Sequence, residues 1–198
     1  MTSEFNAAYT EYQTNRSGLR KWVRKLYLES AARQLQGPTL DFGCGVGELL
    51  ERLPAGSRGL EYNEATVKFC REKGLQVDSY DGFTDGWQLS TLPTGAHFES
   101  MVISHVLEHL DQPTVVLSRL LDASAKLAVR RVLVIVPGRA GFALDPTHRT
   151  FIDLAMLSNP ELTDNGFRLC QSRYFPGNSA ALGNAFPHHE LQVLYQRD

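Results

Sequence analysis

The chain has 198 residues, of which 42% are hydrophobic and 21% are charged, and its formal net charge is −2. This length and composition predict one globular domain and exclude a disordered, collagen-like or disulfide-stapled protein. A domain that binds nucleic acid is usually basic overall, so such a partner is disfavoured. The longest strongly apolar run, 132–136, is far shorter than the roughly 20 residues that span a bilayer. The polar start is not typical of a signal peptide, and three cysteines without a CxxC pair favour a reducing compartment, so we expect a cytoplasmic protein.

The 36 residues before the first expected strand predict a helical cap, with apolar and basic side chains on different faces. The apolar face holds Leu19, Trp22, Val23 and Leu26, and the basic face holds Arg20, Lys21, Arg24 and Lys25. The helix either packs on the sheet with a solvated basic face, or lies as a lid over a ligand site or against an anionic partner. Tyr9, Tyr12 and Arg16 could close over that ligand or could simply pack.

From residue 38 to residue 137, short apolar runs alternate with amphipathic stretches. We expect strands at 39–42, 58–62, 75–77, 98–104 and 131–136, and helices at 46–53, 64–73 and 113–129. Gly74 is a typical residue after a helix end, and Pro54 follows the first helix. Because the strands are nearly continuous apolar runs, they predict a parallel sheet covered by helices on both faces.

Two more strands are expected beyond residue 138, at 167–175 and 190–195. The segment 177–189 between them is too irregular for a crossover helix, so the two strands predict an antiparallel pair at one sheet edge. The expected fold is therefore a Rossmann-like α/β domain, with a seven-stranded, mostly parallel sheet and an antiparallel last strand.

The strongest motif is the glycine loop Asp41-Phe-Gly43-Cys-Gly45-Val-Gly47-Glu48, which follows the first strand. Glycines let the backbone turn tightly and approach a ligand closely. Glu61 ends the next strand, where an acid can accept hydrogen bonds from both hydroxyls of a ribose. The combination predicts a nucleoside site.

The charges around this loop favour one nucleoside over another. A dinucleotide fingerprint is GxGxxG, but Glu48 occupies the place of its third glycine. Asp41 and Glu48 would repel a pyrophosphate and attract a cationic ligand. The pattern therefore favours S-adenosylmethionine, which carries a sulfonium and an ammonium, over NAD.

The loop resembles the first motif of class I S-adenosylmethionine-dependent methyltransferases. Four other segments also resemble the family: 59–63 its second motif, 79–83 the adenine segment, 98–110 the fourth strand of the small-molecule branch, and 132–137 the fifth strand. Within the family, 59–77 is similar to methyltransferase-like proteins associated with methionine biosynthesis, and 145–151 to quinone-type members. Glu99 stands where the family usually has Asp, and the Asp/Asn-Pro-Pro-aromatic motif of enzymes that methylate planar amino groups is absent.

The resemblance implies a role for each matching residue. It divides the chain 1–198 into a helical cap (1–36), a cofactor-binding core (38–137) and an acceptor-side region with edge strands (138–198). It predicts methyl transfer to a small-molecule acceptor at oxygen, with His105 and His148 as catalytic residues. The expected cofactor-binding residues are Asp41, Gly43, Gly45, Gly47, Glu61, Tyr62, Asp81, Phe83 and Ser104.

Three alternatives stay open. One alternative is a zinc peptidase, because the H-x-x-E-H motif of inverted zinc peptidases is matched by His105, Glu108 and His109. Against it, a strand runs directly into His105, Pro113 follows closely after His109, and no third ligand is evident. We therefore expect no metal. A dehydrogenase is disfavoured by Glu48. A non-catalytic relative that binds the cofactor and acts through a protein partner fits the same motifs.

Overall fold

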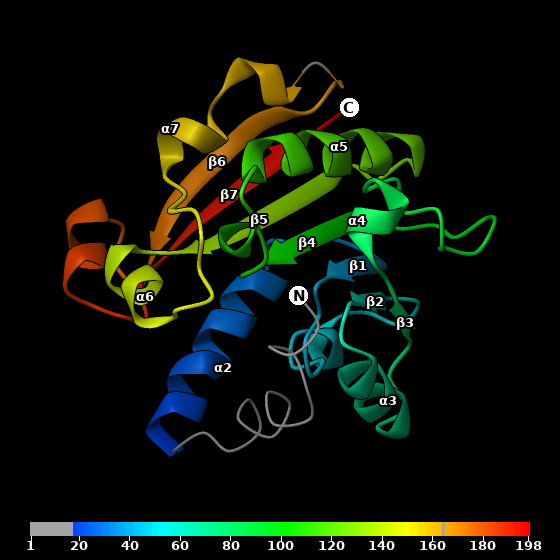
Figure 1. The fold of residues 1–198 in the computed structure, drawn as a ribbon, viewed down its shortest axis with the longest axis horizontal. Helices are drawn as coiled ribbons and strands as arrows, with labels where there is room; N and C mark the ends of the chain where they lie inside the picture. The colour runs from blue at the N-terminus through cyan, green and yellow to red at the C-terminus, as the bar shows by residue number, and fades with distance from the viewer. Residues whose placement is uncertain (1–17, 164) are drawn as a thin grey trace.

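A seven-stranded sheet in the order β3-β2-β1-β4-β5-β7-β6 forms the centre of the protein (Figure 1). The computed structural model describes residues 18–163 and 165–198. The strands are β1 Thr39–Phe42, β2 Arg58–Glu61, β3 Val77–Ser79, β4 Ser100–Ser104, β5 Arg131–Pro137, β6 Arg168–Phe175 and β7 Glu190–Gln196. The strands β1 to β5 are parallel, and β7 is antiparallel to both of its neighbours, β5 and β6. The expected fold class and the antiparallel edge pair are confirmed.

Helices cover both faces of this sheet (Figure 1). They are α2 Gly18–Ala32, α3 Glu64–Glu72, α4 Gly82–Asp85, α5 Pro113–Lys126, α6 Arg139–Leu144 and α7 Leu154–Leu157. Shorter 3₁₀ turns occupy Leu50–Arg52, Leu107–His109, Pro160–Thr163 and Ala180–Asn184. Within the described part of the chain, no helix has the length and apolar character needed to cross a membrane.

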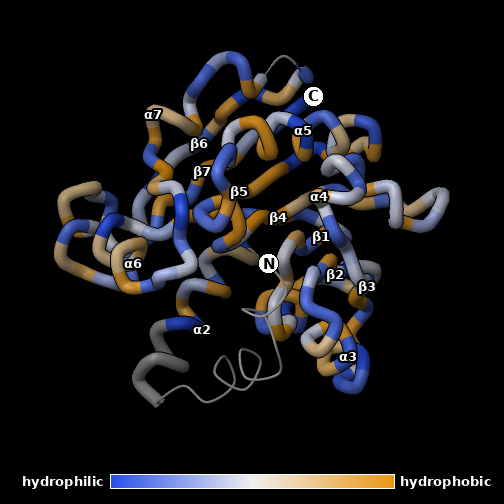
Figure 2. Tube along the Cα trace, viewed as in Figure 1, coloured by the Kyte–Doolittle hydropathy of each residue, from blue (hydrophilic) through white to orange (hydrophobic). Residues whose placement is uncertain are grey.

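The central strands alternate their side chains between two layers of core. Met101 and Val132 pack on the side that holds α5 and α7, whereas Val102 and Leu133 pack on the side that holds α2. Both faces are apolar, and Figure 2 shows β4 and β5 as hydrophobic segments within more polar surroundings. This two-sided burial is what a parallel sheet with helices on both faces requires.

The segment after β1 differs from the helix expected at 46–53. Only the 3₁₀ turn Leu50–Arg52 forms there. Gly45 and Gly47 have φ values of +51° and +78°, in the left-handed region that an α-helix cannot contain. The prediction of a helix was therefore wrong, because the positive φ of Gly47 interrupts the helix that was expected over 46–53.

Two other expected boundaries move for local reasons. The third strand is Val77–Ser79 instead of 75–77, because the N–H of Leu75 donates to the carbonyl of Cys70 and closes α3. Helix α5 ends at Lys126 instead of 129, because Ala128 has a φ of +58°. Gly74 follows α3 with a φ of +81°, as expected.

The N-terminal helix turns a different side to the sheet than its pattern predicts. Leu28 and Ala31 pack against the core, whereas Leu26 is 36% exposed. The expectation for Leu26 was therefore wrong. Tyr9, Tyr12 and Arg16 lie outside the described residues, as do the side chains of Leu19, Arg20, Lys21, Trp22 and Val23.

Candidate functional site

A cavity of about 670 Å³ lies beside the carboxyl ends of the parallel strands. Its walls come from the segments that follow β1, β2, β4 and β5, together with α2 and the start of β7. The strand order reverses between β1 and β4, since β1 pairs with β2 on one side and with β4 on the other. Open α/β sheets bind ligands at such a reversal, in the crevice outside the strand ends.

The glycines of the loop after β1 divide into two groups. Gly43 and Gly45 line the cavity. At Gly43 φ is +70°, and a Cβ would lie 2.4 Å from Cγ2 of Val106, so only glycine fits there. Gly47 is not among the lining residues, and a Cβ on it would lie 2.4 Å from Cδ1 of Leu75. Gly47 therefore lets the loop pack on the segment that closes α3, although the motif predicted all three glycines as cofactor ligands.

Glu61, at the end of β2, ties the glycine loop to the start of α3. Its Oε2 accepts from the N–H of Gly45 at 2.9 Å, and its Oε1 accepts from the N–H of Asn63 at 2.9 Å. Burial raises the pKa of Glu61, although these N–H groups oppose the rise. Each carboxylate oxygen has two lone pairs, so both can accept one further hydrogen bond from a ligand.

Asp41 is a buried carboxyl at the floor of the cavity. It is 2% exposed, and its Oδ2 has no hydrogen-bond partner among the described residues. Burial and the charge of Glu61 raise the pKa of Asp41 to about 7, and the guanidinium of Arg24 opposes this rise. A cation placed in the cavity would stabilise the ionised form of this carboxyl.

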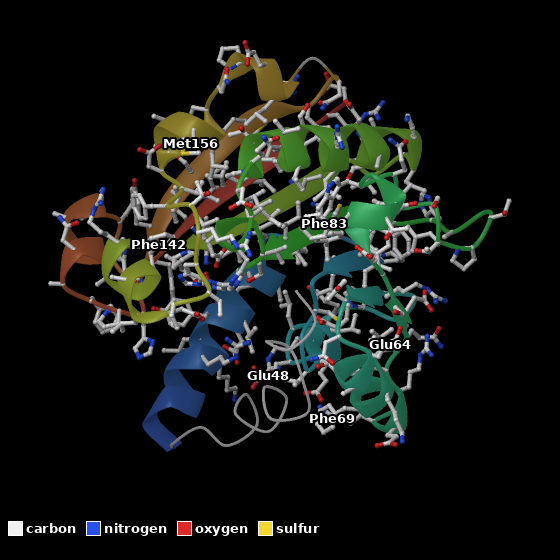
Figure 3. All side chains as sticks on the ribbon, in the orientation of Figure 1. Glu48, Glu64, Phe69, Phe83, Phe142 and Met156 are labelled. Atoms are coloured by element: carbon white, nitrogen blue, oxygen red, sulfur yellow. The ribbon has the colours of Figure 1, made fainter. Side chains whose placement is uncertain are left out.

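Helix α2 contributes a basic side chain to the same end of the cavity. Arg24 lines the cavity and forms an ion pair with Glu48, which Figure 3 labels between α2 and α3. The contact joins α2 to the glycine loop. A lid over a ligand site, one of the two arrangements expected for this helix, agrees with Arg24, Tyr27, Leu28 and Ala31 all lining the cavity.

Aromatic side chains form the wall beyond Glu61. Tyr62 and Phe83 line the cavity and are 48% and 67% exposed. Phe83, labelled on α4 in Figure 3, contacts Trp87 edge to face, with ring centroids 5.1 Å apart. Asp81 is not a lining residue, because its Oδ1 caps α4 by accepting from the N–H groups of Phe83 and Thr84. The structure thus brings Phe83 to the cavity and uses Asp81 to hold the helix that carries it.

His105 follows Ser104, which lines the cavity at the end of β4. Its φ of +55° is uncommon for a residue other than glycine. The ring lies between two carboxylates, with Nδ1 3.1 Å from Glu108 and Nε2 3.3 Å from Glu190. Desolvation lowers the pKa of His105, but the two glutamates outweigh it and raise this pKa to about 10. The imidazole is therefore held as a cation at neutral pH and is not free to accept a proton.

His148 reaches the same end of the cavity from the loop after α6. Its Nδ1 is 2.9 Å from the carbonyl of Phe142, and its ring stacks on that of Phe142, which Figure 3 labels on α6. His109 packs edge to face on His148, with centroids 4.8 Å apart. Burial lowers the pKa of His109 more strongly than the charge of Glu108 raises it. Both catalytic residues expected from the resemblance, His105 and His148, thus line one cavity with the glycine loop.

The comparisons with known proteins agree with this geometry. Residues 33–138 match the family of the methionine biosynthesis protein MetW. The chain belongs to the MetW family. This match covers the glycine loop, Glu61 and the segment that holds Glu108 and His109. A search of curated proteins found no significant match.

Solved structures show the fold of this MetW-family chain in other proteins. A SAM-dependent methyltransferase from Archaeoglobus fulgidus is 21% identical, with a TM-score of 0.69, and the match covers 97% of this chain and 100% of that one. Magnesium protoporphyrin IX methyltransferase from Synechocystis, solved with bound SAH, is 18% identical over 98% and 96%, with a TM-score of 0.67. The methyltransferase bound to the Trm112 activator of Haloferax volcanii is 13% identical over 96% and 93%, with a TM-score of 0.65.

Some cavity residues of this MetW-family chain were not predicted from the sequence. Glu190 was expected only as the start of a strand, yet the antiparallel register pairs it with Pro137 at the carboxyl end of β5. The predicted antiparallel pair contained that signal, since the start of such a strand meets the end of its neighbour. Trp87 lies in a segment for which no element was expected, and it has a φ of +65°.

Proposed function

We propose that this chain binds S-adenosylmethionine in the cavity and transfers its methyl group to the oxygen of a small-molecule acceptor. One observation carries the proposal. The buried carboxyl of Asp41, the half-buried carboxyl of Glu61 and the glycine loop share one cavity with a second group of side chains that includes His105 and His148.

The carboxyls of Asp41 and Glu61 and the glycine loop suit the cofactor. The ammonium of the methionine part would partner the buried Oδ2 of Asp41, which has no partner within the described chain. Glu61 would accept from the ribose hydroxyls, and the exposed rings of Tyr62 and Phe83 would flank the adenine. The bound SAH in the Synechocystis methyltransferase, which has the same fold, supports this choice of cofactor.

The side chains around His105 and His148 suit an acceptor that loses a proton. The acceptor oxygen would attack the methyl carbon as the carbon–sulfur bond breaks, so positioning supplies much of the catalysis. His105 is already protonated and would stabilise negative charge. The Nδ1–H of His148 donates to the carbonyl of Phe142, which leaves the lone pair of the ring on Nε2. His148 is therefore our candidate for the group that activates the acceptor oxygen.

Titration calorimetry with S-adenosylmethionine, SAH and NADH tests the cofactor. We expect the first two to bind and NADH not to bind, and tighter binding of NADH would reject the proposal. A cofactor with a tritiated methyl group, offered with hydroxyl- and carboxyl-bearing metabolite fractions, then tests transfer. Label should enter a small molecule, and the transfer should be weaker with His148→Ala.

The alternative function is a non-catalytic one, in which the chain binds the cofactor and acts through a protein partner. The complex of a methyltransferase of this fold with the Trm112 activator of Haloferax volcanii supports this alternative. Cofactor binding without label transfer to any fraction would favour this alternative. Label transfer by the purified chain alone would reject it.

A further inference from the structure

Three side chains with metal-ligating atoms meet at the acceptor end of the cavity. The 3₁₀ turn after β4 supplies Glu108 and His109, and the loop after α6 supplies His148. One ligand atom from each of the three lies within 4.8 Å of the others. The fold thus brings His148 to His109, which is 39 positions earlier in the sequence. His148 supplies the third ligand that the H-x-x-E-H pattern alone did not offer.

The two imidazoles are oriented as metal-ligating histidines are. The Nδ1 of His148 lies 2.9 Å from the carbonyl of Phe142, and the Nδ1 of His109 lies 3.3 Å from the carbonyl of Thr147. A ring that donates its Nδ1–H to a backbone carbonyl carries its lone pair on Nε2. Such donation fixes the tautomer and the direction of a histidine ligand and makes the ligand more basic.

Glu108 is a buried acid that uses one of its two carboxylate oxygens in a hydrogen bond to another described side chain. Its side chain is fully buried, and Oε1 accepts from Nδ1 of His105 at 3.1 Å. Oε2 is buried and has no hydrogen-bond partner among the described residues. A buried carboxylate oxygen without a partner is costly, so it points to a ligand that would complete the site.

We propose that Glu108, His109 and His148 bind one divalent transition-metal ion at the acceptor end of the cavity. Two imidazoles and a carboxylate suit zinc, manganese or iron(II). Metal–ligand bonds of about 2.0–2.2 Å place ligand atoms no more than roughly 4.4 Å apart, so a small movement would close the site. Asp145 Oδ2 lies 3.8 Å from Nε2 of His148, so this carboxylate is a further oxygen donor close to the proposed site.

The ion would give the acceptor oxygen a binding place, and this step rests on the proposed function. Three protein ligands leave a position open for substrate, as in catalytic metal sites. A hydroxyl bound there loses its proton to solvent more easily. The oxygen then forms its bond to the methyl carbon, and the electron pair of the broken carbon–sulfur bond remains on sulfur. In this arrangement His148 activates the acceptor through the metal ion instead of taking the proton itself.

In the H-x-x-E-H zinc motif His105 would itself be a metal ligand, but the structure gives this side chain another role. Its two ring nitrogens face Glu108 and Glu190, so it holds the Glu108 carboxylate in place instead of joining the ligand set. The proposed site is therefore built from Glu108, His109 and His148, and the predicted absence of a metal was based on a different trio.

Metal binding can be measured without any methyl acceptor. Untagged protein, stripped with a chelator and dialysed, is titrated with Zn²⁺ by calorimetry and with Co²⁺ by visible absorption. We expect one ion per chain and d–d bands typical of Co²⁺ bound by nitrogen and oxygen. His148→Ala and Glu108→Gln should each weaken binding by more than about 100-fold, since even the loss of an outer hydrogen-bond partner costs about 10- to 100-fold.

Controls separate this proposal from the proposed function. His97 is exposed and does not line the cavity, so His97→Ala should bind the ion as the wild type does. Thermal unfolding shows whether each variant is folded, and the near-isosteric Glu108→Gln keeps the test valid if His148→Ala does not fold. Absence of Zn²⁺ and Co²⁺ binding, or binding that survives both substitutions, would overturn the metal site even if S-adenosylmethionine binds. Metal binding without cofactor binding would instead overturn the proposed function alone.

Discussion

The Oε2 of Glu61 accepts a hydrogen bond from the backbone N–H of Gly45 at 2.9 Å, which fixes the glycine loop after β1 to the end of β2. The Glu61 carboxylate therefore both fixes the conformation of the glycine loop and lines the cavity. A substitution at Glu61 should accordingly alter the loop and the ligand contacts together.

Glu61→Ala should weaken binding of S-adenosylmethionine by roughly 1.5–3 kcal/mol, the scale of charge-assisted hydrogen bonds. Calorimetry measures the loss, and circular dichroism checks that the variant is folded. Glu72→Gln is the control, because Glu72 is exposed on α3 and its only ion pair among the described residues is with Lys68. Unchanged affinity in folded Glu61→Ala would remove Glu61 from the binding site.

Gly43→Ala should destabilise the fold more than Gly74→Ala does. Both glycines have positive φ, so both substitutions carry backbone strain of about 1–2 kcal/mol. A Cβ at Gly43 also lies 2.4 Å from Val106, whereas a Cβ at Gly74 meets nothing within 4 Å. The Gly43 variant should therefore lose about 1–3 kcal/mol more, as overpacking does. Urea unfolding of the two variants gives the comparison, and equal losses would show that Val106 moves aside at no cost.

Asp41 should make stability fall as the pH rises. Its folded-state pKa of about 7 is higher than its ordinary value of 3.8, so the protonated form is favoured by folding. The resulting contribution is fully present below pH 3.8 and is lost as the pH rises through about 7. Asp41→Asn has no carboxyl to ionise, so its stability relative to the wild type should rise by about 2.5 kcal/mol between pH 5 and pH 8. Urea unfolding at the two pH values measures this difference, and a pH-independent difference would contradict the raised pKa.

Arg24 and Glu48 should show a measurable coupling energy between α2 and the glycine loop. The side chains are 36% and 30% exposed, so a double-mutant cycle with Arg24→Met and Glu48→Gln should give about 0.5–1 kcal/mol. The same cycle on Lys68 and Glu72, which are 80% and 65% exposed, should give less. A coupling near zero for the first pair would mean that α2 does not hold the loop through this contact.

Much of the sheet was predictable from the sequence, because apolar runs such as Thr39–Phe42 and Arg131–Pro137 are buried on both faces. The loop 46–53 was not, since its conformation depends on the positive φ of Gly45 and Gly47. The cofactor end of the cavity comes from segments close together in sequence, and the glycine motif indicated it. The acceptor end depends on tertiary contacts of Glu108 with His148 and of His105 with Glu190, and spacing along the chain does not reveal them.

The position of β7 between β5 and β6 has a consequence for how the protein folds. Within the described chain, β6 has no strand neighbour except β7, and β5 meets β7 only after an intervening stretch of more than 50 residues. Pairings between strands so distant in sequence lower the folding rate, because the loop must close before the contacts form. Glu190, at the first position of β7, therefore reaches His105 only after this long stretch of chain has closed. The pairing of β1 with β4 closes a stretch of similar length, so the glycine loop after β1 and the contact between His105 and Glu190 both depend on pairings that are distant in sequence.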